Sequence, residues 1–161
     1  MYKRVLIPLD GSRLAEGILP FILQIASPLD LDVVLLRVEQ PMAPHAIEGT
    51  THFTADDIAA RLRTAREYLA PVAADLRRQG LQVMTDARYG DPVTEIVAAA
   101  RQSRADLIAM STHGRSGLTR LVLGSVAEAV LRRAAVPVLI MRLEEGKRAA
   151  TSQSERSLAN A

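Results

Sequence analysis

The sequence predicts an α/β fold, namely an open, doubly wound parallel sheet of five strands, Rossmann-like, with helices on both faces. Two observations carry this prediction. Apolar segments of strand length alternate along the chain with longer segments of helical period. Most of the short segments are apolar almost throughout, which is typical of strands covered on both faces in a parallel sheet. Right-handed crossovers between such strands then produce a doubly wound sheet.

Each predicted strand is a short apolar segment that ends at turn residues or charges. The segments RVLIPLD at 4–10, DVVLLRV at 32–38 and ADLIAMS at 105–111 are nearly continuous apolar runs. LQVMTDAR at 81–88 alternates more clearly between apolar and polar residues, and VPVLIMR at 136–142 completes the set. Segments of this length and composition favour strands over helices.

The predicted helices lie between these strands, and each begins beside a residue that suits a helix cap. They cover residues 12–26, 55–79, 92–103 and 126–135. The predicted caps are Ser12, Thr54, Asp91 and Ser125. Pro92 stands at the first helical position after Asp91, where its missing N–H costs nothing.

Two finer features of the helices are also predicted. Ser125 and Glu128 have the spacing of a capping box, in which a hydroxyl and a carboxylate each accept a free backbone amide. Pro71 lies inside the second helix, and we expect it to kink or split that helix because it cannot donate a backbone hydrogen bond. Residues 40–53 are predicted to form a long loop.

The chain is predicted to form one domain, residues 1–142, followed by a tail. Its 161 residues leave room for a single hydrophobic core, and two domains would be cramped. The last segment, LEEGKRAATSQSERSLANA at 143–161, lacks an apolar face and is predicted to be disordered.

Charge and composition argue against several classes of partner. The net charge is only +2, and the arginines are interspersed with acids rather than gathered with aromatics, so no nucleic-acid partner is predicted. No cysteine is available for a disulfide or a thiol nucleophile. The first apolar run is too brief for a signal segment or a membrane span, so we expect a cytoplasmic protein without a membrane partner.

The predicted architecture locates a ligand site before any motif is considered. Ligands of open α/β sheets bind beyond the carboxyl ends of the strands, where the strand order reverses. Asp10-Gly11-Ser12 follows the first strand, and MSTHGRSGLTRLVLGS at 110–125 follows the fourth. Gly124-Ser125 would stand at a helix N-terminus, where free amides and the helix dipole favour an anion such as phosphate. The alternative is that the glycines only form the turn.

Residues 1–142 resemble the universal stress protein family. The resemblance is carried by MYKRVLIPLDGS at the amino terminus and by the segment from Gly90 to Arg142, which contains the glycine-rich stretch. It implies a five-stranded parallel sheet and a homodimer paired through the last strand, here Pro137 to Arg142. Burial of an apolar edge strand in a dimer is physically reasonable, since an exposed edge promotes association.

The resemblance extends to the motif of the family's nucleotide-binding branch: Gly, two residues, Gly, nine residues, then Gly-Ser or Gly-Thr. Here the second glycine is Gly114 and the final pair is Gly124-Ser125. Ser111 stands at the first position instead of glycine. Serine still offers an amide and a small donor, so we expect this departure to adjust nucleotide binding rather than abolish it.

The resemblance also implies roles for individual residues. The backbone of Val38 would pair with the adenine edge and Asp10 would hold the ribose. The residues that match the family's binding positions are Pro8, Asp10, Val38, Met110, Ser111, Gly114, Gly124, Ser125 and Val126. The amides from Gly114 and from 124–126 would take the phosphates. ATP is therefore the leading ligand, ADP and AMP are close alternatives, and Mg²⁺ is a candidate companion of the nucleotide.

Each of these residues also has a purely structural interpretation. Asp10 could cap the turn into the first helix, Ser125 could cap the last helix, and Met110 could fill the core. His113 is more typical of a hydrogen-bonding loop residue than of a catalytic one. No histidine shows a metal-binding spacing such as HExxH, so no metal site is predicted.

The sequence predicts a binding module rather than an enzyme, with at most slow ATP hydrolysis or autophosphorylation. It has no GxxxxGK[ST] loop, no GxSxG elbow, and no GxGxxG after the first strand. Two alternatives remain open at this point. One is a nucleotide-free dimeric regulatory member of the same family, in which Ser111 signals a lost site. The other is a nucleotide-transferring enzyme, which the missing Ser-Gly-Gly loop disfavours.

Overall fold

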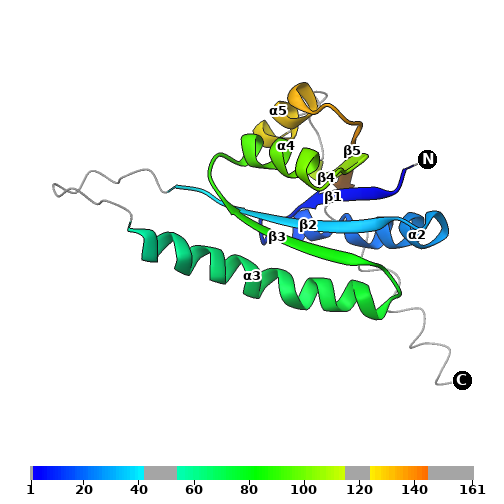
Figure 1. The fold of residues 1–161 in the computed structure, drawn as a ribbon. Helices are drawn as coiled ribbons and strands as arrows, with labels where there is room; N and C mark the ends of the chain where they lie inside the picture. The colour runs from blue at the N-terminus through cyan, green and yellow to red at the C-terminus, as the bar shows by residue number, and fades with distance from the viewer. Residues whose placement is uncertain (1, 42–53, 115–123, 145–161) are drawn as a thin grey trace, which may run out of the picture.

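The fold is described by a computed structural model over residues 2–41, 54–114 and 124–144. Strands and helices follow one another along the chain as the sequence predicts (Figure 1). The elements are β1 (Arg4–Pro8), α1 (Arg13–Glu16), α2 (Leu19–Leu29), β2 (Asp32–Glu39), α3 (Ala55–Arg78), β3 (Val83–Tyr89), α4 (Pro92–Gln102), β4 (Leu107–Gly114), α5 (Ser125–Arg133) and β5 (Val138–Glu144).

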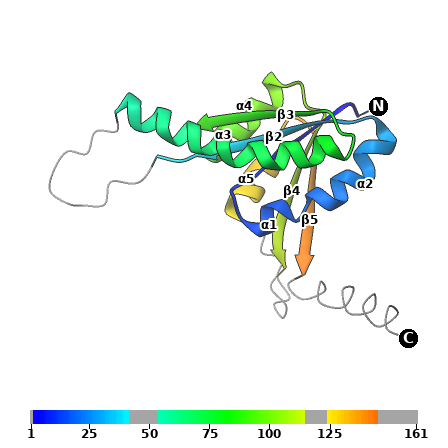
Figure 2. The same cartoon turned by 90° about the horizontal axis from the view of Figure 1, so that it is seen from below.

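The five strands form one parallel sheet in the order β3-β2-β1-β4-β5. Helices α2 and α3 cover one face, and α4 and α5 cover the other (Figures 1 and 2). The strand order reverses at β1, whose neighbours are β2 on one side and β4 on the other. The predicted open, doubly wound α/β fold is therefore confirmed.

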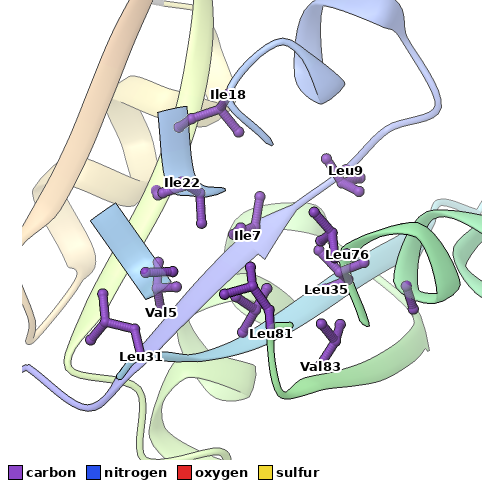
Figure 3. Close-up of a cluster of buried hydrophobic side chains, with 14 of the residues drawn as sticks. Val5, Ile7, Leu9, Ile18, Ile22, Leu31, Leu35, Leu76, Leu81 and Val83 are labelled. Atoms are coloured by element: carbon purple, nitrogen blue, oxygen red, sulfur yellow. The ribbon is translucent and has the colours of Figure 1, made fainter. Parts of the chain in front are cut away.

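The sheet separates two hydrophobic cores. Side chains alternate along β1, so Val5 and Ile7 pack toward α2 and α3 while Leu6 packs toward α4 and α5. All three are fully buried. Figure 3 shows the first of these clusters, in which Ile22 of α2 and Leu76 of α3 meet the strand side chains. Burial on both faces explains why the strand segments are continuously apolar.

The predicted helix at 12–26 is wrong, because two helices occupy this region. Ser12 does cap α1, and its hydroxyl accepts the Ala15 amide at 3.0 Å. The first helix ends after one turn at Gly17. Pro20 then stands in the first turn of α2, and because its nitrogen has no hydrogen it could not continue α1 by donating to an α1 carbonyl.

Pro71 was predicted to kink or split the second helix, and the split does not occur. Helix α3 runs over 24 residues with Pro71 inside it. Proline removes one helical hydrogen bond, a loss of about 3 kcal/mol in an isolated helix. Here Pro71 lies on the exposed side, while Leu69 and Ala73 on either side of it are buried against the sheet. Packing along the whole helix therefore outweighs the missing bond.

Several strands are longer than predicted at their carboxyl ends. β4 continues to Gly114, and its last residues pair with β5 in the register Thr112 to Arg142 and Gly114 to Glu144. β5 thus includes Leu143 and Glu144, which were predicted to belong to the tail. The remainder of the predicted tail, and most of the predicted loop at 40–53, lie outside the described residues.

Candidate functional site

A cleft of about 290 Å³ lies where the strand order reverses, at the carboxyl ends of β1, β2 and β4. Helix α1 borders it on one side, and the N-terminal turns of α4 and α5 border it on the other. This is the position at which open α/β sheets bind ligands. The lining residues are Pro8, Leu9, Asp10, Ser12, Leu14, Ala15, Leu36, Val38, Gln40, Pro92, Ile96, Met110, Ser111, Thr112, Gly124, Ser125, Val126 and Ala127.

The structure brings eight of the nine predicted binding residues to this one cleft. They are Pro8, Asp10, Val38, Met110, Ser111, Gly124, Ser125 and Val126. The ninth, Gly114, is the last residue of β4, and its place relative to the cleft stays a prediction. What these residues bind remains a prediction, but their convergence from five different elements or turns follows from the topology.

Asp10 shapes the turn that leads from β1 into α1. Its Oδ1 accepts the Ser12 amide at 2.8 Å, so the structural role considered for this carboxylate is present. Its Oδ2 has no hydrogen-bond partner among the described residues. Gly11 adopts a φ of +82°, and a Cβ there would lie 2.8 Å from Nη1 of Arg37. The positive φ favours glycine in this turn, whereas the nearby Arg37 atom is the far end of a flexible side chain and could shift.

The hydroxyl of Ser111 is already in use. Its Oγ donates a hydrogen bond of 2.6 Å to the carbonyl of Leu14, and this bond joins β4 to α1 across 97 positions of sequence. The expectation that this serine offers a donor to a ligand is therefore wrong for the side chain as it stands. Its hydroxyl instead satisfies a carbonyl at the end of a very short helix.

The start of α5 differs from the predicted capping box. Gly124, not Ser125, is the N-cap, and no side chain accepts the first amides of the helix. Ser125 is the first helical residue, so its hydroxyl is one position too late to cap. The carboxylate of Glu128 accepts instead from Arg132 at 2.8 Å. An uncapped helix start with its amides at a cleft is suited to an anion.

A polar network lies beside the Asp10 turn on the α3 side. The Tyr68 hydroxyl donates to Glu16 at 2.7 Å, and the guanidinium of Arg37 lies 5.4 Å from the centre of the tyrosine ring. Arg37 also pairs with Glu39 at 2.8 Å. Burial, and then the bond to Glu16, raise the pKa of Tyr68 above its ordinary value. The phenol therefore stays protonated and holds α1 against α3.

The described residues offer no dedicated cage for a metal ion. Within 2–41, 54–114 and 124–144, three or more His, Cys, Asp or Glu side chains nowhere gather as metal ligands would. Mg²⁺ that accompanied a nucleotide would be held chiefly by phosphate oxygens and water, which is its usual state in such sites. Over the same part of the chain, no helix has the length and apolar character needed to cross a membrane.

Several lining residues were not predicted from the sequence to belong to the binding site. Thr112, Gln40 and the α4 residues Pro92 and Ile96 all contribute to the cleft. Thr112 could have been found by strand alternation, since it lies two positions after Met110 and so on the same face. The α4 residues could not, because only the packing of α4 against the sheet brings them to the cleft.

Comparison with known proteins identifies the family. The family model of the universal stress proteins matches residues 1–142. The chain belongs to the universal stress protein family. Universal stress protein MJ0531 of Methanocaldococcus jannaschii is 33% identical to it over 144 residues, which cover 88% of this chain and 83% of the relative.

Solved structures share the fold of this universal stress protein. The structure of protein MJ0577 of Methanocaldococcus jannaschii superposes with a TM-score of 0.73 at 28% identity, covering 91% of this chain and 99% of the other. A universal stress protein in complex with cAMP has a TM-score of 0.65 at 22% identity, covering 87% of this chain and 97% of the other. At that identity the likeness shows the fold alone.

Proposed function

We propose that this universal stress protein binds an adenine nucleotide, ATP first and ADP or AMP as alternatives, in the cleft at the strand-order reversal. We further propose that it acts as a homodimeric regulatory module of the cytoplasm rather than as an enzyme. One observation supports the binding above all others. The uncapped N-terminus of α5 and the unpartnered oxygen of Asp10 line a single cleft at the switch point of the sheet.

The lining of the cleft suits the parts of a nucleotide. Apolar side chains such as Pro8, Val38 and Ile96 supply walls for a base. Oδ2 of Asp10 is available to accept a hydrogen bond from a ribose hydroxyl. The amides that begin α5 suit the phosphates, because helix N-termini bind anions through free N–H groups and the helix dipole.

Neighbours in fold support the class of ligand. One universal stress protein was solved with cAMP, and another, from Archaeoglobus fulgidus, with dAMP. Both are 22% identical to this chain, so they show only that the shared fold can hold an adenine nucleotide.

The decisive experiment is calorimetric titration of the purified full chain with ATP, alongside the variant Gly124→Val. A Cβ at Gly124 meets no atom within 4 Å, so the fold should accept a side chain there. The valine would occupy the space in front of the first α5 amides. We expect ATP affinity to fall by at least about tenfold, equivalent to about 1.4 kcal/mol, with an unchanged circular dichroism spectrum.

Gly124→Ala provides the graded control, since its single methyl should weaken binding less than valine does. Unchanged affinity in the valine variant would place the nucleotide elsewhere. Steady-state ATP turnover on the order of 1 per second or faster would make the protein an enzyme and overturn the regulatory proposal.

A nucleotide-free regulatory dimer is the second candidate, and one observation favours it. Ser111 stands at the first motif position, where the family motif has a glycine without a side chain. Its hydroxyl donates a hydrogen bond to the Leu14 carbonyl of α1. Release of small molecules by heating freshly purified protein separates the candidates. Adenine nucleotide in the supernatant supports the first, and an empty site without measurable ATP affinity supports the second.

A further inference from the structure

Two neighbouring residues of β4, Ser111 and Thr112, carry hydroxyl groups that the strand directs to opposite faces. Ala109, on the Ser111 side, belongs to the cluster under α2 and α3, whereas Met110, on the Thr112 side, belongs to the cluster under α4 and α5. The Ser111 hydroxyl bonds to α1 on the first side. Thr112 therefore faces the side on which α5 begins.

Thr112 is unusual among the described residues because its polar side chain is buried. It is 7% exposed, and no other polar residue in the described part of the chain falls in the buried class. Its hydroxyl has no hydrogen-bond partner among those residues. Buried hydroxyls in native proteins are nearly always paired, so an unpaired one calls for a partner that is not part of the chain as described.

The Thr112 hydroxyl is open to the cleft rather than sealed in the core. Two side-chain atoms among the described residues are both sealed from solvent and unpaired, namely Nε of Arg4 and Nη1 of Arg37. Oγ1 of Thr112 is also unpaired but is not among these sealed atoms, so it retains some exposure. Since Thr112 lines the cleft, that is the space its hydroxyl reaches.

The place of Thr112 in the sheet indicates which part of a ligand it meets. Gly124 and Ser125, at the uncapped start of α5, line the same cleft. Val38, at the end of β2, is separated from β4 by β1. Adjacent strands lie about 5 Å apart, so Thr112 is about 10 Å from the β2 end of the cleft. With the base at Val38, as proposed above, Thr112 lies away from the base and on the side of the cleft where α5 begins.

We propose that Thr112 is a phosphate-binding residue of the cleft, where its Oγ1 donates a hydrogen bond to a phosphate oxygen held at the N-terminus of α5. This inference rests on the proposed nucleotide binding and extends it, because it requires a ligand with at least one phosphate. The two β4 hydroxyls then have different roles. Ser111 bonds to α1, and Thr112 contacts the ligand.

The test is calorimetric titration of wild type, Thr112→Val and Thr112→Ser with ATP, AMP and adenosine. Valine keeps the shape and the strand preference of threonine and replaces only the hydroxyl, by a methyl group. We expect Thr112→Val to bind ATP about ten- to a hundredfold more weakly, as befits a hydrogen bond to a charged group, and to bind adenosine as wild type does. Thr112→Ser should retain most of the ATP affinity.

Thr85→Val is the matched control, because Thr85 is an exposed strand threonine on β3 and does not line the cleft. It should bind ATP like wild type. Should Thr112→Val fail to fold, Thr112→Ala takes its place in the same titrations.

The failures of the two proposals are distinguishable. Wild type without ATP affinity overturns the proposed function and, with it, the role of Thr112. Wild type that binds ATP, together with a Thr112→Val variant of equal affinity, overturns the Thr112 inference alone. An equal loss for adenosine and ATP also overturns it, because the contact would then not be to phosphate.

Discussion

Ser111 illustrates how much a single side chain depends on its tertiary surroundings. The sequence showed Ser111 in place of a motif glycine, and its hydroxyl was expected to be available as a hydrogen-bond donor. In the structure its hydroxyl lies 2.6 Å from the Leu14 carbonyl, at the end of a helix of one turn. The residue that departs from the motif thus supports the wall of the cleft formed by α1.

Removal of this hydroxyl should reduce stability. Ser111→Ala loses one hydrogen bond between β4 and α1 and leaves the Leu14 carbonyl without that donor, so we expect a loss of about 1 kcal/mol in the free energy of unfolding. Urea denaturation followed by circular dichroism measures it. Thr64→Ala is the control, because the Thr64 hydroxyl bonds to Ala60 within its own exposed helix. Equal stabilities of Ser111→Ala and wild type would show that the bond contributes nothing.

Helix α4 is the element whose sequence signals match the structure most fully. Asp91 caps it by accepting both the amide and the hydroxyl of Thr94, at 2.9 and 2.6 Å, and Pro92 begins it. Helix α5 lacks such a side-chain cap, although Ser125 and Glu128 have the spacing of a capping box. The difference is one position of register, which the local sequence does not settle.

The cap of α4 predicts an acid dependence of stability. The hydrogen bonds from Thr94, first its hydroxyl and then its amide, lower the pKa of Asp91 below its ordinary value. A carboxylate with a lowered folded-state pKa stabilises the fold above its unfolded pKa, and that contribution is lost as the pH falls through the folded value. Between about pH 5 and pH 3, Asp91→Asn should therefore lose stability less steeply than wild type.

Urea denaturation across that pH range provides the measurement. Asp56→Asn removes the same charge from an exposed position near the start of α3 and is measured beside Asp91→Asn as a control for the loss of one carboxylate. Asp57 and Asp106 also have lowered pKa values, through bonds from Thr54 and from the amides of Lys3 and Arg4. The Asp91 variant therefore keeps part of the acid dependence of stability. If its unfolding free energy changed with pH as steeply as that of wild type, the role of the cap would be contradicted.

At the scale of the whole molecule, the two edges of the sheet differ. The β3 edge carries Arg88, which pairs with Asp86 at 2.7 Å and with Glu95 at 3.5 Å. Charged side chains on an edge strand discourage pairing with another chain. The β5 edge instead consists mainly of half-buried apolar residues from Val138 to Met141. This asymmetry favours β5 as the surface of the proposed homodimer.

Ile140→Pro tests that surface. The Ile108 amide bonds to the Pro137 carbonyl, and Ile140 pairs with Met110 in the β4–β5 register, so the Ile140 amide points away from β4. Proline there removes a donor from the free edge while the β4 ladder remains. We expect wild type to sediment as a dimer in analytical ultracentrifugation and the variant to sediment as a folded monomer. Ile140→Val should remain dimeric, and a monomeric wild type would contradict the proposal.

The sequence alone predicted the strands, the α/β class and the position of the cleft, because these depend on local composition and on simple rules of topology. Continuous apolar runs such as 32–38 indicate strands buried on both faces, whatever their partners. The residues predicted to bind a nucleotide came from matching positions of the family motif, and eight of them line one cleft.

Only the tertiary structure decided the finer features. Pro71 remains inside an unbroken helix because packing against the sheet outweighs one missing bond, and Ser111 bonds to a carbonyl 97 positions away. Thr112 is buried yet lines the cleft together with the start of α5, and only the packing of the chain brings these segments together. Local sequence specifies the capacity of a residue to donate, accept or pack, whereas the fold determines which partner is within reach.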